Sequence, residues 1–341
     1  MATFSVGQSI GAGFSLVARR PLDVLIWGLV IWVVGFLPLI WILSSVMSSM
    51  GPLIAASEAA TTVGKDTAAG MQNSEQFMQA YMQAIGPLMV FQPLLLVGSL
   101  VLRGVLTSAV CRAILEPEDD RLAYLRLGMR EVWMVLVVIV MAFIIGFAMF
   151  AALIPVAILL GIAAAVIGQS GMNGVGGAVF AIIAVVALIA LFCAVIWLSL
   201  RLIMGVFMSF DQNQFRLFES WGFTRGHTAK MVVLVLIQVV LVLLAEVILI
   251  ALIAAIGMSI ASTIHLSEQT LRAMFTHPAT AWNSQVIALV GLGSLVLAII
   301  GGFLLAIIQA PWVEAYRQLR DSGASGSPAY VPSLGEAQPL A

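Results

Sequence analysis

Six long apolar runs constrain this chain more than any other feature of its sequence. Each run is longer than the ~20 residues that a helix needs to cross the ~30 Å hydrocarbon core of a bilayer. The runs cover residues 22–46, 87–111, 132–155, 178–204, 231–257 and 286–311. Only 9% of the residues are charged, whereas about 25% are charged in an ordinary soluble domain. The pattern predicts an all-α, polytopic transmembrane bundle of six spans.

The cations predict the orientation of these spans. Twelve Lys and Arg residues fall in the segments on the side of the N-terminus, and only Lys65 and Arg272 fall on the other side. Cations accumulate in cytoplasmic loops, so we expect both termini to be inside. The first apolar run exceeds the ~7–15 residues of a signal-peptide core, so we expect it to remain as a span. Residues 1–320 then form a transmembrane domain, and the Gly-, Ser- and Pro-rich residues 321–341 a disordered cytoplasmic tail.

Charge and cysteine content exclude several function classes. The net charge of −1 gives no basic field that would attract a nucleic acid. Cys111 and Cys193 lie in separate apolar runs, which excludes a disulfide framework and a cysteine-based zinc site. The sequence contains no motif of a phosphate-binding loop, a zinc protease, a serine hydrolase or a dinucleotide-binding fold. We therefore expect no cofactor, no bound metal and no catalysis.

A short amphipathic segment precedes each odd-numbered span. These segments cover residues 8–20, 121–131 and 214–229, and each has an apolar stripe edged by cations, as in helices that lie in the headgroup plane. One interpretation is three repeats, each with an interfacial helix and two spans. The other is that every inner membrane end attracts cations independently. We expect contact with anionic lipid headgroups through the residues Arg19, Arg20, Arg121, Arg126, Arg130, Trp221, Arg225 and Lys230. The alternative is that these charges only set the orientation during insertion and have no specific role afterwards.

Parts of the chain resemble a bacterial family of integral membrane proteins. The opening FSVGQSIGAGFSLVARRPLDVLIW, the stretch around Arg201 with Ser220-Trp221 and Thr224-Arg225-Gly226, and the ending PWVEAYRQLRD carry the resemblance. The family is that of the YciC-like proteins and the glycerophosphoryl diester phosphodiesterase membrane domain. The resemblance implies a multi-pass protein of the bacterial inner membrane with a role in envelope or lipid homeostasis. Only thirty residues follow position 311, so we expect no appended phosphodiesterase domain.

Three ionisable residues inside the spans are the remaining candidates. Glu246 falls near the middle of the fifth span, where a carboxyl group costs several kcal/mol unless it has a partner. It suits either a proton or ion pathway or a structural pairing between helices, and in both cases we expect it to face helices or a cavity. Arg103 and Arg201 lie near the inner ends of their spans, where they either snorkel to the surface or hold a lipid headgroup.

The leading hypothesis from the sequence is a non-catalytic membrane protein that contacts or handles lipids. Its expected partners are membrane lipids, anionic ones included, and another membrane protein, with no nucleic acid among them. The alternative is a secondary transporter or channel that uses Glu246. The sequence does not indicate an oligomeric state.

Overall fold

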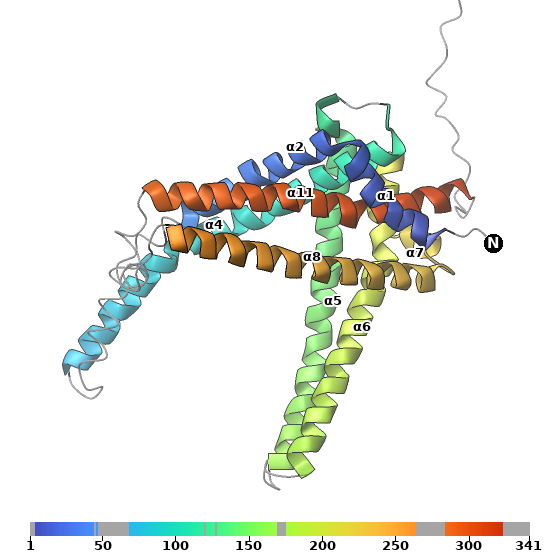
Figure 1. The fold of residues 1–341 in the computed structure, drawn as a ribbon. Coiled ribbons are helices and arrows are strands. Elements are labelled where there is room, and N and C mark those ends of the chain that lie inside the picture. Colours follow the sequence, from blue (N-terminus) through green and yellow to red (C-terminus); the bar gives the residue numbers. More distant parts are fainter. Residues whose placement is uncertain are drawn as a thin grey trace, which may run out of the picture.

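The computed structural model describes residues 4–43, 46, 68–118, 121–126, 128–168, 175–263 and 284–322. Within these ranges the chain forms helices joined by turns and contains no strand (Figure 1). The elements are α1 (Val6–Arg19), α2 (Pro21–Ile31), η1 (Trp32–Phe36), α4 (Ala68–Leu115), η2 (Arg121–Tyr124), α5 (Met129–Gly168), α6 (Val175–Gln212), α7 (Ser220–Phe223), α8 (Thr228–Thr263) and α11 (Ser284–Asp321).

Six of the helical segments are long and apolar enough to cross a membrane. They are Pro21–Leu43, Met89–Leu115, Met129–Ile162, Ala178–Gln212, Thr228–Ala255 and Val290–Asp321. Each overlaps one of the six predicted spans, so the prediction of an all-α, multi-pass membrane protein is confirmed. Large apolar side chains such as Phe143, Phe147 and Val247 are exposed along these helices. Only a lipid environment makes such a surface favourable, because water would have to solvate it.

The long helices meet at one end and separate at the other (Figure 1). We call the meeting region the hub. It consists of α1, η2 and α7 with the turns around them, the C-terminal ends of α4, α6 and α11, and the N-terminal ends of α2, α5 and α8. From the hub, α5 and α6 leave together as one hairpin. The group formed by α2, α4, α8 and α11 leaves at a steep angle to that hairpin, so the six helices are not mutually parallel.

The tightly packed core lies in the hub. Its largest buried side chains include Trp27, Tyr124, Phe207 and Tyr316, which come from four different elements. Towards the far ends of α5, α6 and α8, most side chains are exposed. Packing between helices therefore holds their hub ends together, and the parts of the helices far from the hub are left to contact lipid.

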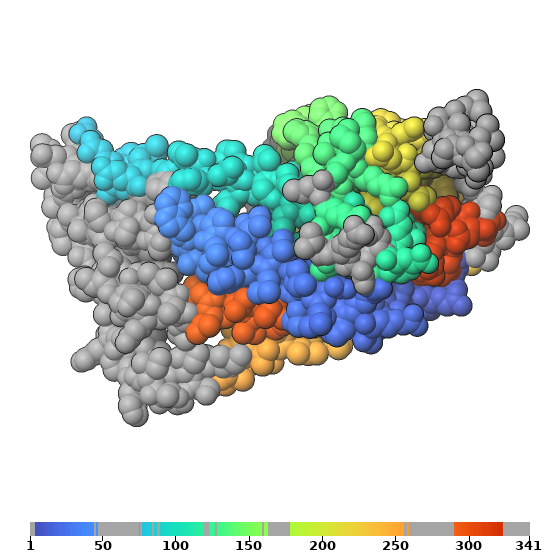
Figure 2. Space-filling view, turned by 90° about the horizontal axis from the view of Figure 1, so that it is seen from above, coloured from blue at the N-terminus to red at the C-terminus, as the bar shows by residue number. Residues whose placement is uncertain are grey.

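Both described ends of the chain lie at the hub. The backbone N–H of Ser5 donates a hydrogen bond to Oε1 of Gln318, at 2.7 Å. Seen from above, α1 and α2 (dark and mid blue) lie over α11 (orange-red), and α8 (orange) runs along one edge (Figure 2). The two described ends of the chain therefore lie close together.

A contact between glycines allows α2 and α11 to cross closely. A Cβ atom on Gly302 would lie 2.7 Å from the carbonyl oxygen of Val24 and 2.8 Å from the backbone nitrogen of Gly28. A Cβ atom on Gly28 would lie 2.7 Å from the Cα atom of Ile299. Small residues at such crossings let helix backbones approach in a membrane, where packing rather than water exclusion drives association.

The three predicted interfacial segments do not fold alike. The first is a helix as predicted, since α1 covers Val6–Arg19. In place of a helix over 121–131, the chain forms the 3₁₀ turn η2, and α5 begins only at Met129. In place of a helix over 214–229, it forms turns around the four-residue α7, and α8 begins at Thr228. These two segments are short connections that pack into the hub, which leaves no room for two further turns of helix.

The predicted repeat units also differ in how their spans pair. The two spans of the second unit, α5 and α6, pack extensively against each other. In contrast, α11 packs mainly on α1 and α2 and only sparsely on α8, its partner in the third unit. Pro155 does not end the third span, because α5 continues through it to Gly168.

Candidate functional site

The hub contains a buried ion pair between consecutive spans. Arg112, near the end of α4, pairs through Nη2 with Oε1 of Glu131 in the first turn of α5, and the two side chains are only 7% and 2% exposed. Arg112 also donates from Nη1 to the carbonyl oxygen of Tyr124 at 3.0 Å. Oε2 of Glu131 accepts the backbone N–H of Gly128 at 2.7 Å. Each charge thus has both an opposite charge and a further hydrogen bond, as burial requires.

The same network fixes the connection between α4 and α5. The indole N–H of Trp27 on α2 donates to the carbonyl oxygen of Ala123 at 2.9 Å. Ala123 and Tyr124 have φ angles of 53° and 63°, a left-handed conformation that is unfavourable for residues other than glycine. The hydrogen bonds from Trp27 and Arg112 to the carbonyl groups of these two residues stabilise the strained turn.

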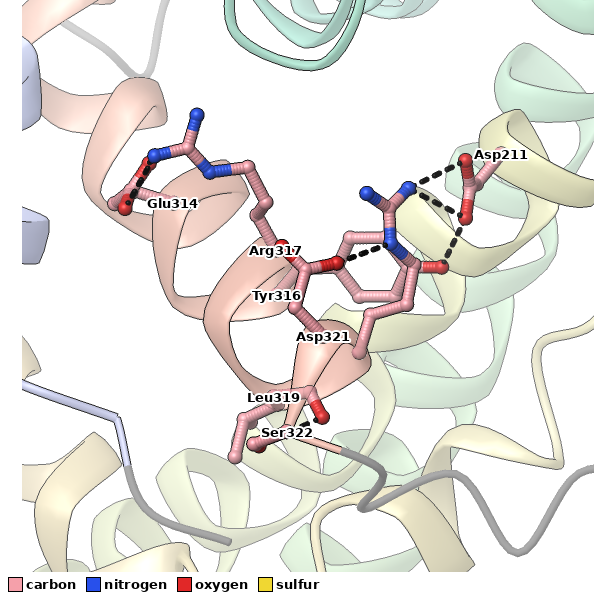
Figure 3. Close-up of polar contacts among 8 residues, drawn as sticks. Asp211, Glu314, Tyr316, Arg317, Leu319, Asp321 and Ser322 are labelled. Atoms are coloured by element: carbon pink, nitrogen blue, oxygen red, sulfur yellow. Dashed lines mark hydrogen bonds and ion pairs between the residues drawn. The ribbon is translucent and has the colours of Figure 1, made fainter.

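A second polar cluster joins α6 to α11 (Figure 3). Asp211 accepts the hydroxyl proton of Tyr316 at 2.8 Å and pairs with Nη1 of Arg320 at 3.0 Å. Figure 3 shows that Tyr316 points towards Asp211, whereas Arg317 lies on the other side and reaches Glu314. This cluster ties the C-terminal end of α11 to the end of α6.

Several cations expected to contact lipid are engaged within the hub instead. Arg20 donates to the carbonyl oxygen of Pro117 at 2.9 Å and lies over the ring of Tyr124. Arg130 pairs with Glu116, and Lys230 donates to the carbonyl oxygen of Phe4 at 3.2 Å. These contacts give Arg20, Arg130 and Lys230 a role in holding the hub together.

The other predicted interfacial cations are placed differently. Arg19 and Arg225 are exposed and have no hydrogen bond or ion pair within the described part of the chain. Arg126 is half-buried, and it too interacts with another residue of the protein. Arg121 belongs to η2, and its side chain lies outside the described ones. Of the predicted set, Arg19 and Arg225 therefore present charge outward.

Arg201 lies beside two tryptophans at the side of the hub. Its guanidinium carbon is 5.7 Å from the ring centroid of Trp197 and 5.6 Å from that of Trp221. The two indole rings contact each other edge to face, with centroids 5.1 Å apart. Trp197 comes from the same helix, one turn earlier, and Trp221 comes from α7. The serine of the Ser220-Trp221 pair donates to the carbonyl oxygen of Arg201 at 2.7 Å, which positions α7 against α6.

The donors of Arg201 are incompletely used. Nη1 makes two long contacts of 3.4 Å, to the carbonyl oxygen of Trp221 and to Oγ1 of Thr224. Nε is buried without an acceptor. Within the described residues, Nη2 has no hydrogen bond. Trp197 and Trp221 are 47% and 42% exposed, so the site opens outward.

The predicted orientation of Glu246 is wrong for the single chain. Glu246 lies within the span Thr228–Ala255, as predicted, but its side chain is exposed. It has no hydrogen bond or ion pair to any described residue. Arg103 is likewise exposed on α4 without such a partner. The structure therefore does not bring Glu246 together with Arg103 or Arg201.

His227, just before α8, is the titratable group outside the spans whose environment changes its pKa. Partial burial lowers the pKa of this imidazole from its ordinary 6.5, and the nearby charge of Lys230 lowers it further. His227 is therefore neutral at physiological pH.

Sequence reasoning missed Arg112, Glu131 and Asp211 as members of buried networks. One signal was present for the first two, because they have opposite charges and flank the same short connection between spans two and three. Asp211 gave no such signal, because its partners are more than a hundred residues away. In the described part of the chain, no group of three or more His, Cys, Asp and Glu residues could hold a metal ion. The histidines His265 and His277 lie outside the described residues.

Comparison of the chain with protein-family models, with curated proteins and with solved structures found no match in any of the three.

Proposed function

We propose that this chain is a non-catalytic, multi-pass protein of the bacterial inner membrane that binds anionic phospholipids at its cytoplasmic face. The observation that carries the proposal is the Arg201 site, a guanidinium group within a span that lies beside two outward-facing tryptophans. The resemblance to YciC-like proteins and the predicted cytoplasmic position of the hub support the placement.

The depth of Arg201 suits a phosphate group. Arg201 precedes the last residue of α6 by eleven positions, which corresponds to about 16 Å along the helix. An arginine at this depth extends its stem towards the interface. Tryptophan rings prefer the headgroup level, where the ring is buried and the N–H stays in polar surroundings. Together these features support an arginine charge at the level of the lipid phosphates.

The free donors of Arg201 define the kind of ligand. A guanidinium group binds phosphate through two parallel hydrogen bonds, a geometry that an ammonium group cannot reproduce. Among the described residues Nη2 has no acceptor, and the contacts of Nη1 are long enough to be exchanged for better ones. A phosphodiester oxygen pair would therefore complete the hydrogen bonding of this side chain.

The transporter hypothesis receives less support. A transport pathway would need Glu246 to line a route across the protein, but its side chain is exposed on the outside of α8. We therefore prefer lipid binding as the function of this chain.

Native mass spectrometry of the protein in nanodiscs tests the proposal. The discs contain phosphatidylcholine and phosphatidylglycerol, and the measured quantity is the number of phosphatidylglycerol molecules that stay bound. We expect Arg201→Gln to lower retention about tenfold, and Arg201→Lys to restore it only partly because lysine lacks the planar fork. Arg103→Gln is the matched control, since it removes an equal charge from a span without tryptophan neighbours. Equal retention by Arg201→Gln and the wild-type protein contradicts the proposal.

A further inference from the structure

A polar pocket of about 640 Å³ lies in the hub, away from the residues of the Arg201 site. Three elements form it: α1, the C-terminal end of α4 with the turn that follows, and α11. Its wall residues that carry the argument are Gly11, Ser15, Arg19, Arg20, Glu314 and Arg317. None of these residues belongs to α6 or α7, so the pocket is structurally independent of Arg201.

The charges around the pocket favour an anion. Arg19, Arg20, Arg317 and Glu314 line it, and Asp23 lies 3.8 Å from Arg20, so three arginines face two carboxylates and one positive charge is in excess. The carboxylate of Glu314 is already occupied, because it accepts Nη2 of Arg317 at 2.8 Å and Nε2 of Gln318 at 2.9 Å. Glu314 is also buried, so it acts as a fixed support for Arg317 rather than as a ligand for a cation.

Two of the three arginines are held in place by the protein. Arg317 is fixed by Glu314, and its side chain remains 42% exposed. Arg20 is fixed by its hydrogen bond to the carbonyl oxygen of Pro117 and by the ring of Tyr124, 5.0 Å from its guanidinium carbon. Arg19 is exposed and has no hydrogen bond or ion pair within the described residues. The pocket thus combines two pre-positioned cations with one that can close on a ligand.

Small residues on α1 keep the pocket open. Gly11, Ala12 and Ser15 line it, and a Cβ atom on Gly11 would meet no atom within 4 Å. A side chain at position 11 therefore occupies space that the protein leaves empty.

We propose that this pocket binds the phosphate group of a phosphate ester or of free phosphate. Three arginines around one pocket supply positive charge and N–H donors for a phosphate, which accepts paired N–H donors from arginine. A lipid headgroup and a small soluble phosphate share this chemistry. The pocket does not depend on lipid binding at Arg201, so either proposal can fail without the other.

The test uses the full-length protein in phosphatidylcholine nanodiscs with two probes. The first is radiolabelled inorganic phosphate, followed by equilibrium dialysis. The second is phosphatidylglycerol included in the discs, with the retained molecules counted by native mass spectrometry. Gly11→Leu fills the pocket without removing a charge, and Arg19→Gln removes a cation that has no structural contact. Gly7→Leu is the matched control, because position 7 on the same helix is also open but does not line the pocket.

We expect Gly11→Leu and Arg19→Gln each to weaken binding of one probe about tenfold or more, and Gly7→Leu to leave it unchanged. If the affected probe is inorganic phosphate, the ligand is a soluble phosphate. If it is phosphatidylglycerol, the ligand is a headgroup. The proposal is overturned if the wild-type protein retains neither probe, or if Gly11→Leu and Arg19→Gln both bind as the wild type does. Thermal unfolding of each variant confirms that it is folded.

Discussion

Arg112 at the end of α4 and Glu131 at the start of α5 form an ion pair that is almost entirely buried in the hub. The molecule has two arms, the hairpin of α5 and α6 and the group formed by α2, α4, α8 and α11 (Figure 1). The pair joins these arms, because α5 belongs to the first and α4 to the second. Arg112 also supports the strained turn at Tyr124, and Glu131 caps the first turn of α5 through Gly128. This pair therefore determines how the arms are set relative to each other.

Removing either partner of this pair should destabilise the protein strongly. We expect Glu131→Gln and Arg112→Met each to cost about 3–5 kcal/mol, because each leaves a buried charge uncompensated. The double variant Arg112→Met/Glu131→Leu should lose less than the sum of the two single losses, because it leaves no buried charge. Chemical unfolding in detergent micelles measures these differences. Additive losses would show that the two residues do not act as a pair.

Much of the fold was predictable, because a bilayer leaves few choices for the backbone. A chain in hydrocarbon must satisfy its own hydrogen bonds, so apolar runs such as 178–204 become helices. The partners of Arg112 were less accessible, since the contact depends on a turn in which Ala123 and Tyr124 adopt positive φ angles. The orientation of Glu246 was missed for another reason: α8 is apolar on all sides, so its sequence indicates depth but not direction.

The close crossing of α2 and α11 should not tolerate a methyl group. We expect Gly302→Ala to lower stability by about 1–3 kcal/mol, since the new Cβ atom would approach backbone atoms of α2 to under 3 Å. Gly291→Ala on the same helix is the control, because a Cβ atom there meets nothing within 4 Å. Alanine is the better helix former, so this control should be neutral or slightly stabilising. Thermal unfolding of both variants in the same detergent compares them, and equal melting temperatures would be evidence against the close packing.

The hub should face the cytoplasm. In a Cys193→Ala background, we expect a cysteine at exposed position Glu118, in the hub, to react with a membrane-impermeant thiol reagent only after cells are permeabilised. A cysteine at exposed position Glu75, near the start of α4 and far from the hub, should react in intact cells. The remaining native cysteine, Cys111, is buried. Labelling of position 118 from outside would reverse the assigned orientation.

Stability should fall in mild acid partly through His227. The pKa of this side chain is below 6.5 in the folded protein, because of burial and then Lys230. As the pH drops below 6.5, the unfolded chain binds a proton that the folded chain does not, so unfolding becomes more favourable. Stability is thus retained above pH 6.5 and is lost towards the folded pKa. Between about pH 7 and about pH 5, we expect the melting temperature of the His227→Gln variant to fall less than that of the wild-type protein. Identical pH profiles would contradict the assignment.

The central claim is that Arg201 holds a lipid phosphate beside Trp197 and Trp221. Electron cryomicroscopy of the protein in nanodiscs that contain phosphatidylglycerol tests this claim most directly. We expect headgroup density with a phosphate within about 3 Å of the Nη atoms of Arg201, beside both indole rings. A well-resolved Arg201 side chain that hydrogen-bonds only to protein or water, with no lipid density beside the two tryptophans, would contradict the account.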